Sequence, residues 1–429
     1  MRKSTFILVI VLVVAILVGG MYWFYNRSTS PSDDTTNQPS NNGFSPFGRN
    51  DVKTPDITTD TTPQATSTPV VVSNNRIELP KLRQLSATPV GGMSASTTKM
   101  RSLTLASTTI NATIVRFIDR GMGHVYEAND VNLAVEKISN TTLPKIYESY
   151  WNKDLTSVIL RYLRDNTDEV TSFYAEIRPV ATSTASSTTP FEIKGKYLSS
   201  TINQIAVSPT GDKIFTWNIE GGRGIGYISS FDEKNKVKVI DVPFTQVQIA
   251  WPEANTLTIN TNASALSFGF LYTVNVKTGE MKKVVGNVRG LSTKMSADAA
   301  KLLYSFSGQG SIGTGIYTIK DSKVGEVIFK TLADKCVWST VRKNEVYCAV
   351  PTEIPNGAYP DDWYKGTVSF VDKIWHLDTS TGEVHLLGDL LKLSNKLIDA
   401  TQLTLDPKEN YLYFVNKKDL SLWSLDLTQ

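Results

Sequence analysis

The sequence predicts an all-β fold, a β-propeller of seven four-stranded blades that follows an N-terminal transmembrane helix. From residue 76 onward helical periodicity is nearly absent, and short runs rich in Val, Ile, Thr, Tyr and Phe alternate with Gly, Asn and Asp turns. A unit of two apolar strands joined by a polar turn recurs at the spacing of propeller blades. The two ends of this region are each an incomplete unit, as a closed ring requires.

The recurring unit is clearest in three segments, IAVSPTGDKIFTW (205–217), TKMSADAAKLLYSF (293–306) and LTLDPKENYLYFV (403–415). Weaker copies contain Trp151, Trp251 and Trp338, so that equivalent points fall near residues 151, 208, 251, 296, 338 and 405. The two widest intervals hold insertions, a Ser/Thr-rich surface loop at 181–190 and a loop at 352–366. A second hairpin follows each unit, as at 271–286 and 374–388, which makes four strands per blade.

Ring closure is expected from the two ends of the repeat region. The segment 112–139 supplies an early blade, whereas LWSLDLTQ (422–429) ends after a third strand and ELPKLRQLSATPV (78–90) contains a strand without partners. We expect these two segments to meet in one blade, because closure leaves no exposed sheet edge. Rings of six or eight blades are compatible with the same repeats.

The N-terminus predicts a membrane anchor. Basic residues precede an uncharged apolar run at 5–25, which as a helix would extend roughly 30 Å. The run is long for a signal peptide, has no small-residue cleavage site at its end and contains no Cys for lipid attachment. We therefore expect residues 1–27 to form a cytoplasmic tip and anchor in the cytoplasmic membrane, 28–75 a disordered Ser/Thr/Pro/Asn-rich linker, and 76–429 a propeller outside.

Composition excludes several classes of function. The 44 Lys and Arg balance 41 Asp and Glu, and no basic block marks a phosphate-binding face, so nucleic acid is not an expected partner. With 3 His and 2 Cys, the chain lacks ligands for zinc-ribbon or iron–sulfur sites. No hydrolase motif of the G-x-S-x-G or H-E-x-x-H kind occurs. We expect no metal, no cofactor and no catalytic residue.

Two glycine clusters have a spacing that imitates nucleotide-binding loops. Gly308, Gly310 and Gly313 match a dinucleotide fingerprint, but the segment that follows, 315–320, is β in character and offers no helix N-terminus for a pyrophosphate. A second cluster at 222–226 occupies the corresponding position of an earlier blade. Both are predicted to be loops between blade strands.

The insertion PTEIPNGAYPDDWYKG (351–366) is the strongest candidate for a binding site. It combines Asp361 and Asp362 with the aromatic residues Tyr359, Trp363 and Tyr364. If the aromatic rings are exposed, they can stack on sugar rings or fill a pocket of a partner, and the carboxylates can accept hydrogen bonds from hydroxyls. The alternative is a lid that packs over its own blade with the rings buried.

Arg116, Arg120 and His124 form a weaker candidate site. The turn DRGMGHVYE (119–127) could bring them to the channel mouth, where one His and two Arg would suit an anion. A solvated turn explains the same residues. The other histidines, His376 and His385, are expected at exposed strand positions.

Cys336 and Cys348 are predicted to form a disulfide. They flank a polar turn centred on Arg342, so a hairpin places them directly opposite each other. A location outside the cytoplasm allows such a bond to persist. Two buried free thiols are the alternative.

The strand–SPxGxx–strand pattern at 208–215, and in weaker form at 296–303 and 405–412, resembles that of TolB-like and WD-repeat-like propellers of bacteria. The segments KLRQLSATPVGG (81–92), DRGMGHVYE (119–127) and KCVWSTVRKNEVYCAVP (335–351) are also similar to a group of membrane-anchored bacterial propeller proteins without an assigned activity. The resemblance implies fold and topology and transfers no catalytic residue.

Together these features favour a binding or scaffolding module of the cell envelope, anchored in the membrane by its N-terminal helix, with an envelope protein or a glycan as its partner. A glycan hydrolase or lyase that uses acidic residues of the propeller channel is the alternative. A structural subunit of an envelope assembly is a third possibility.

Overall fold

The computed structural model describes residues 80–101, 109–131, 134–164, 169–180 and 191–429. The predicted transmembrane helix, the linker at 28–75 and the loop at 181–190 lie outside these residues. No helix within the described ranges is long and apolar enough to span a membrane.

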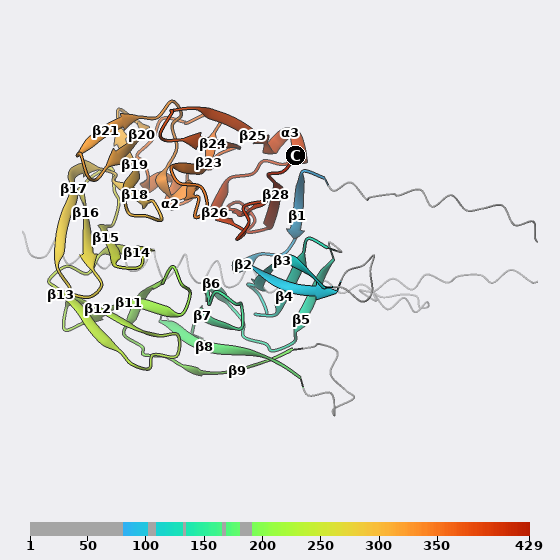
Figure 1. Cartoon of the computed structure of the whole chain (residues 1–429). Helices are drawn as coiled ribbons and strands as arrows, with labels where there is room; N and C mark the ends of the chain where they lie inside the picture. Colours follow the sequence, from blue (N-terminus) through green and yellow to red (C-terminus); the bar gives the residue numbers. More distant parts are fainter. Residues whose placement is uncertain (1–79, 102–108, 132–133, 165–168, 181–190) are drawn as a thin grey trace, which may run out of the picture. The chain divides into compact units, whose positions relative to one another are not determined.

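The described residues form seven four-stranded antiparallel sheets arranged as a ring of blades (Figure 1). Blades 1 and 2 contain β2 (Val90–Arg101), β3 (Thr109–Asp119), β4 (Val125–Asn129) and β5 (Val135–Ser139), then β6 (Ile146–Trp151), β7 (Ser157–Leu163), β8 (Val170–Pro179) and β9 (Phe191–Tyr197). Blades 3 and 4 contain β10 (Ile202–Val207), β11 (Lys213–Glu220), β12 (Arg223–Ser230) and β13 (Val237–Val242), then β14 (Val247–Glu253), β15 (Thr256–Thr261), β16 (Phe268–Asn275) and β17 (Met281–Arg289).

Blades 5 and 6 contain β18 (Ser292–Met295), β19 (Lys301–Gly308), β20 (Ser311–Thr318) and β21 (Lys323–Glu326), then β22 (Cys336–Trp338), β23 (Glu345–Pro351), β24 (Asp372–Asp378) and β25 (Val384–Asp389). Blade 7 contains β26 (Ala400–Leu405), β27 (Tyr411–Asn416), β28 (Leu422–Asp426) and, from the other end of the propeller, β1 (Leu82–Ser86). Three short helices, η1 (Ala333–Lys335), α2 (Asp361–Tyr364) and α3 (Leu390–Ser394), lie in connections. The predicted seven-bladed, all-β propeller is therefore confirmed.

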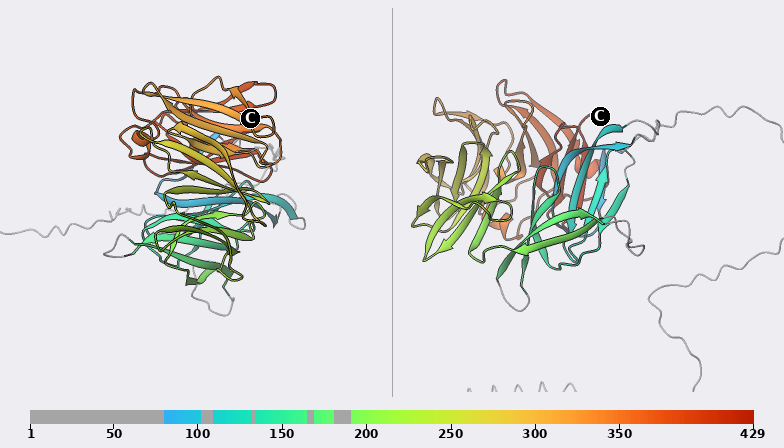
Figure 2. Two further views of the ribbon diagram at one scale, coloured as in Figure 1. Left: turned by 90° about the vertical axis from the view of Figure 1, so that its left-hand side faces the viewer. Right: turned by 60° about the horizontal axis from the view of Figure 1, so that its bottom comes forward.

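The strands of each blade, named A to D from the ring axis outward, run between two faces of the ring (Figure 2). Because neighbouring strands are antiparallel, the B–C connections and the D–A connections between blades share one face, which we call the upper face. The A–B and C–D connections share the lower face. The A strands of adjacent blades contact one another, for example β2 with β6 and β10 with β14, and surround a central channel.

The repeated sequence pattern corresponds to the A–B turns of the lower face. In blade 3, the Ser208 Oγ accepts a hydrogen bond of 3.0 Å from the amide of Lys213, five residues later. Ser296 and Asp406 accept equivalent bonds from the amides of Lys301 and Tyr411 in blades 5 and 7. A side-chain acceptor at the start of the turn satisfies the amide that begins the next strand, which explains why Ser or Asp recurs there.

The glycine clusters lie in β-hairpins, as the sequence indicates. Gly310 (φ 73°) and Gly222 (φ 75°) occupy short turns between the B and C strands of blades 5 and 3. The left-handed backbone of these turns favours Gly, because it lacks a Cβ atom. The spacing of the glycines therefore reflects the geometry of β-hairpin turns.

Ring closure occurs between the two predicted segments. β1 pairs antiparallel with β28, with Leu82 opposite Leu425 and Gln84 opposite Trp423. Leu82 and Leu85 are buried against the core. The first described strand thus completes the blade that the last three strands begin.

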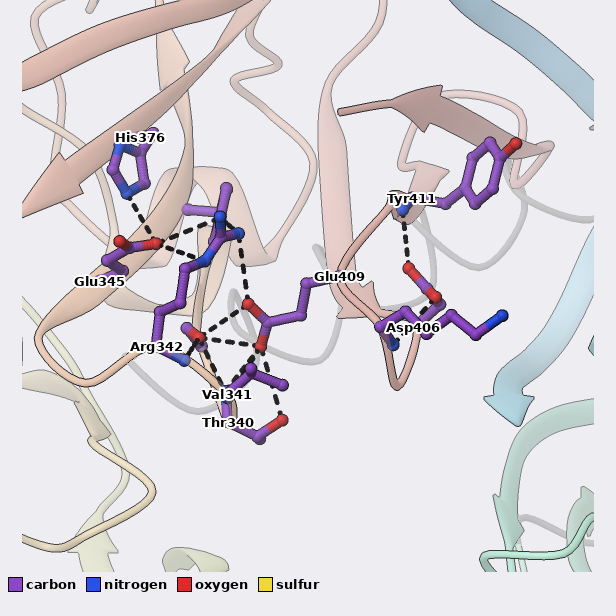
Figure 3. Close-up of polar contacts among 11 residues, drawn as sticks. Thr340, Val341, Arg342, Glu345, His376, Asp406, Glu409 and Tyr411 are labelled. Carbon is purple, nitrogen blue, oxygen red and sulfur yellow. Dashed lines mark hydrogen bonds and ion pairs between the residues drawn. The ribbon is translucent and has the colours of Figure 1, made fainter. Parts of the chain in front are cut away.

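A polar clasp on the lower face joins blade 7 to blade 6 (Figure 3). The buried carboxylate of Glu409 accepts hydrogen bonds from the Ser339 hydroxyl at 2.7 and 2.8 Å and from the amides of Thr340 at 2.8 Å and Val341 at 3.2 Å. Consecutive amides that converge on one carboxylate form an anion-binding nest, here filled from the neighbouring blade. The clasp adds to the closure of the ring.

The histidines of blade 6 differ from the expectation in part. His385 is exposed, as predicted. His376 is partly buried, because its ring packs at 5.1 Å from the ring of Tyr347, and its Nε2 lies 3.2 Å from Glu345 (Figure 3).

The predicted disulfide is confirmed. Cys336 on β22 lies directly opposite Cys348 on β23, and their sulfur atoms are bonded. Both residues are buried in the core that blades 5 and 6 share.

Replacement of both cysteines, as Cys336→Ala with Cys348→Ala, should lower the free energy of unfolding by at most about 2 to 3 kcal/mol, since the bond closes a short loop. Denaturant unfolding of the full chain measures this change. In the unaltered protein, neither cysteine should react with an alkylating reagent under denaturing, non-reducing conditions, and alkylation of both would contradict the bond.

Candidate functional site

Two adjacent cavities open on the upper face. The larger, of about 1240 Å³, lies over blades 2 and 3 and is lined by Tyr147, Tyr150, Tyr162 and Tyr197, and we call it the tyrosine cavity. The smaller, of about 410 Å³, lies in the channel among the A strands of blades 2, 3, 4, 5 and 7, and we call it the channel cavity. Both are lined by Tyr150, Gln204 and Gln248, so the two cavities lie next to each other.

A strand irregularity places the polar groups of the tyrosine cavity. The pairing of β6 with β7 shifts between Ile146 and Glu148, which places Glu148 opposite Arg161. The Glu148 carboxylate accepts hydrogen bonds of 2.9 Å from the Arg161 guanidinium and from the Tyr150 hydroxyl. Burial and the charge of Glu148 raise the pKa of Tyr150, so this hydroxyl stays protonated.

The floor of this cavity holds polar atoms without partners. Arg161 is 3% exposed and donates hydrogen bonds to the carbonyls of Asn203 at 2.8 Å and Ile202 at 3.4 Å, which ties blade 2 to blade 3. Its Nε and the hydroxyl of Ser172 are buried and have no hydrogen-bond partner among the described residues. A buried donor without a partner costs about 1 to 3 kcal/mol.

Aromatic rings form the walls of the cavity. Tyr197 is 63% exposed, receives a hydrogen bond of 3.2 Å from the Tyr162 hydroxyl and packs edge-on against Phe173. The Arg161 guanidinium lies 5.8 Å from the centre of the Tyr147 ring. Burial, with the charge of Glu148, raises the pKa of Tyr147 to about 12. The walls thus present neutral hydroxyls and flat apolar faces.

The channel cavity carries two charged side chains, Lys294 of β18 and Asp334 of η1. Asp334 accepts hydrogen bonds from the hydroxyls of Ser292 at 2.5 Å and Tyr364 at 3.0 Å. Lys294 is exposed to the channel, and its ammonium forms no hydrogen bond or ion pair with a described residue. Desolvation by the channel walls lowers the pKa of Lys294, and the charge of Asp334 offsets this in part.

The insertion between β23 and β24 is a lid over one side of the channel mouth, near the A strands of blades 5 to 7 (Figure 1). Tyr359 is fully buried and Trp363 is 3% exposed, because both pack with Ile312 and Leu332 of blade 5 and Phe370 of the lid. Of the two alternatives for the insertion, the lid with buried rings holds for these two residues. Tyr364 is 37% exposed, but its hydroxyl is bound to Asp334.

The two adjacent acidic residues of the lid have structural partners. Asp361 accepts hydrogen bonds from the Ser264 hydroxyl at 2.9 Å and the Ala265 amide at 2.6 Å, both in blade 4. Asp362 accepts a bond of 2.7 Å from the amide of Ala358 within the lid. The carboxylate of Asp361 therefore attaches the lid to the ring, whereas that of Asp362 stabilises the lid internally.

A buried charge cluster, which sequence reasoning missed, holds the base of the lid. The ammonium of Lys335 is fully buried, lies 2.8 Å from Asp372 and is bonded to Asp399. Asp399 also accepts hydrogen bonds from the Trp363 indole at 3.0 Å and the Phe370 amide at 3.0 Å. Burial raises the pKa of Asp372 to about 6, despite the neighbouring ammonium. Because these residues come from separate segments of the chain, no local sequence signal connects them.

The structure does not bring the three residues of the predicted anion site together. Arg116 is buried, pairs with Glu127 at 2.8 Å and donates to the carbonyl of Leu155 at 2.7 Å. Arg120 and His124 lie in the B–C turn of blade 1 on the upper face, both partly exposed. Among the described residues, no group of three or more His, Cys, Asp or Glu side chains could hold a metal ion.

The fold and its cavities define a seven-bladed propeller whose channel mouth is covered on one side and open on the other. No family model matches the chain, and no curated protein matches it. Among solved structures it is similar to an oligogalacturonate lyase in complex with manganese, with 10% identity over 79% of this chain and 98% of that one and a TM-score of 0.49. It is also similar to the β-propeller domain of the trilobed protease from Pyrococcus furiosus, with 11% identity over 77% and 95% and a TM-score of 0.47.

A third similar structure is TolB from Acinetobacter baumannii, with 12% identity over 78% of this chain and 79% of that one and a TM-score of 0.41. These similarities concern the arrangement of the blades. They carry no information on a ligand.

Proposed function

We propose that this chain is a binding module of the cell envelope and that the tyrosine cavity is its recognition site for a glycan. The observation that carries the proposal is an open cavity walled by four tyrosines, with the ion pair of Glu148 and Arg161 in its lining. Sugar rings offer flat C–H faces to aromatic walls and hydroxyls to polar groups. The cavity has the size of a site for several sugar units.

The charged residues that line the tyrosine cavity favour a ligand of low charge density. Its lining contains Arg161 and Arg164 together with Glu148 and Glu169. Two cations and two anions balance, so the lining has no excess positive charge to attract a nucleic acid or another polyanion.

Anchoring by the apolar run at 5–25 and tethering by residues 28–75 would place this site outside the cytoplasm. The disulfide of blade 6 supports that location, since such bonds persist in oxidising compartments. A glycan of the envelope is then within reach of the tether.

The alternative function, a hydrolase or lyase that uses channel carboxylates, is less well supported. Glu148 is held by Arg161 and Tyr150, and Asp334 by Ser292 and Tyr364. Both carboxylates are thus engaged by neighbouring side chains, which favours a positioning role over catalysis.

Calorimetric titration of the full chain with trisaccharides of glucose, N-acetylglucosamine and galactose tests the proposal. We expect at least one to bind, and Tyr197→Ala to weaken that binding by about 5-fold, since a stacked ring contributes about 1 kcal/mol. Tyr317→Ala is the matched control, because this half-buried tyrosine lines neither cavity. Binding of none of the three, or an equal loss in both variants, would refute the glycan site.

A further inference from the structure

We infer that the channel cavity binds a carboxylate group of the ligand that occupies the tyrosine cavity, with Lys294 as the cationic partner. The preferred ligand is then a glycan chain that ends in a sugar acid, with its neutral rings on the tyrosines and its acidic end in the channel. This inference rests on the proposed function.

The first support is the state of Lys294. Its side chain projects from the short A strand β18 into the channel, and its ammonium has no hydrogen bond or ion pair with a described residue. The other charged residue of the cavity lining, Asp334, already receives hydrogen bonds from Ser292 and Tyr364. The cavity therefore contains one engaged anion and one ammonium with three donors to offer.

The second support is the environment of that ammonium. The channel walls disfavour its charge, as its lowered pKa shows. An incoming carboxylate would relieve this cost through a charge-assisted hydrogen bond, which is stronger than a bond between neutral groups. A neutral hydroxyl would relieve it less. The cavity is thus better suited to an anion than to another sugar hydroxyl.

The third support is a local distortion of β26 on the same cavity. The pairing of β26 with β27 shifts between Thr401 and Thr404, and Gln402 within this bulge has a left-handed backbone (φ 53°). The bulge leaves Gln402 exposed on the lining of the channel cavity. Its amide is a neutral donor that can complete the recognition of a carboxylate beside Lys294.

The two cavities lie close enough for a single ligand to reach both sites. Tyr150, Gln204 and Gln248 line both, so a chain lying on the tyrosines can direct its end toward the channel axis. The lid closes the opposite side of the mouth, where Trp363 lines the channel cavity. A glycan would therefore enter from blades 2 and 3 with its terminal residue first.

The test compares two trisaccharides by calorimetry with the full chain at constant salt: one of glucose, and the same molecule with glucuronic acid as its terminal residue. We expect the acidic form to bind at least about 10-fold more tightly. Lys294→Met should abolish this preference, whereas Lys294→Arg should retain most of it. Tyr197→Ala should weaken both sugars by a similar factor and leave the preference intact. Equal melting temperatures of the Lys294 variants and the wild type exclude a loss of fold.

Equal affinity for the two sugars, or a preference that survives Lys294→Met, would overturn the inference and leave the proposed glycan site standing. Failure of both sugars to bind would instead contradict the proposed function and, with it, the inference.

Discussion

Deletion of β1 should abolish the cooperative unfolding of the propeller. This strand supplies the outer edge of blade 7 and buries Leu82 and Leu85. Loss of two buried leucines costs about 2 to 5 kcal/mol each, which together approaches the whole stability of a typical domain. The deletion also exposes the unpaired edge of β28, which invites association with other chains.

Calorimetric melting and size-exclusion chromatography of a chain that lacks residues 80–86 measure this effect. We expect a melting transition that is broadened or lost, together with soluble aggregates. Removal of seven residues from the linker, 60–66, is the matched control and should leave the melting unchanged. A β1 deletion that melts like the wild type would show that the ring does not depend on this closure.

Lys335→Met should be the most destabilising single substitution of the lid region. It removes the cation between Asp372 and Asp399 and leaves both carboxyl groups in a fully buried site. Removal of one partner from a buried ion pair typically costs about 3 to 5 kcal/mol. Denaturant unfolding measures the change, and Lys365→Met, at an exposed position of the same lid, is the control. A loss below about 1 kcal/mol would contradict the role assigned to the cluster.

The pH dependence of stability provides an independent check on this cluster. The pKa of Asp372 is about 6 in the folded protein and near 4 when unfolded, so the folded state binds the proton more tightly. The contribution of Asp372 to the free energy of unfolding is therefore fully present below pH 4 and is lost as the pH rises through 6. The change is on the order of 2 to 3 kcal/mol. Without the ammonium, the folded-state pKa rises further. The free energy of unfolding that Lys335→Met loses relative to the wild type should thus be larger at pH 8 than at pH 5.

Sequence reasoning succeeded where the determining contacts are local. The repeat is visible because Ser208 and its equivalents bind an amide five residues away, so the turn carries its own signature. The disulfide follows from the hairpin centre between Cys336 and Cys348, which fixes the register of β22 and β23. Blade number and closure followed from the spacing of such local units.

The functional surface was less accessible to prediction, because it depends on contacts between blades. Tyr359 and Trp363 resemble recognition residues in sequence, but Ile312 and Leu332 of another blade bury them. The tyrosine cavity combines residues from strands and loops of two blades, and the position of Glu148 depends on a strand irregularity. The alternation of apolar and polar residues along a strand cannot show which blades lie under the lid and which remain open at the channel mouth.

Hydrogen–deuterium exchange of the full chain, with and without a saturating concentration of the glucuronic-acid trisaccharide, tests the position of the binding site. We expect slower exchange in peptides that cover 146–151 and 198–204, which border the tyrosine cavity, and in 292–295 beside the channel cavity. Peptides of the lower-face turns at 208–212 and 339–344 should not change. Protection confined to those turns, or no protection anywhere at saturation, would contradict the assignment of the binding site to the upper face.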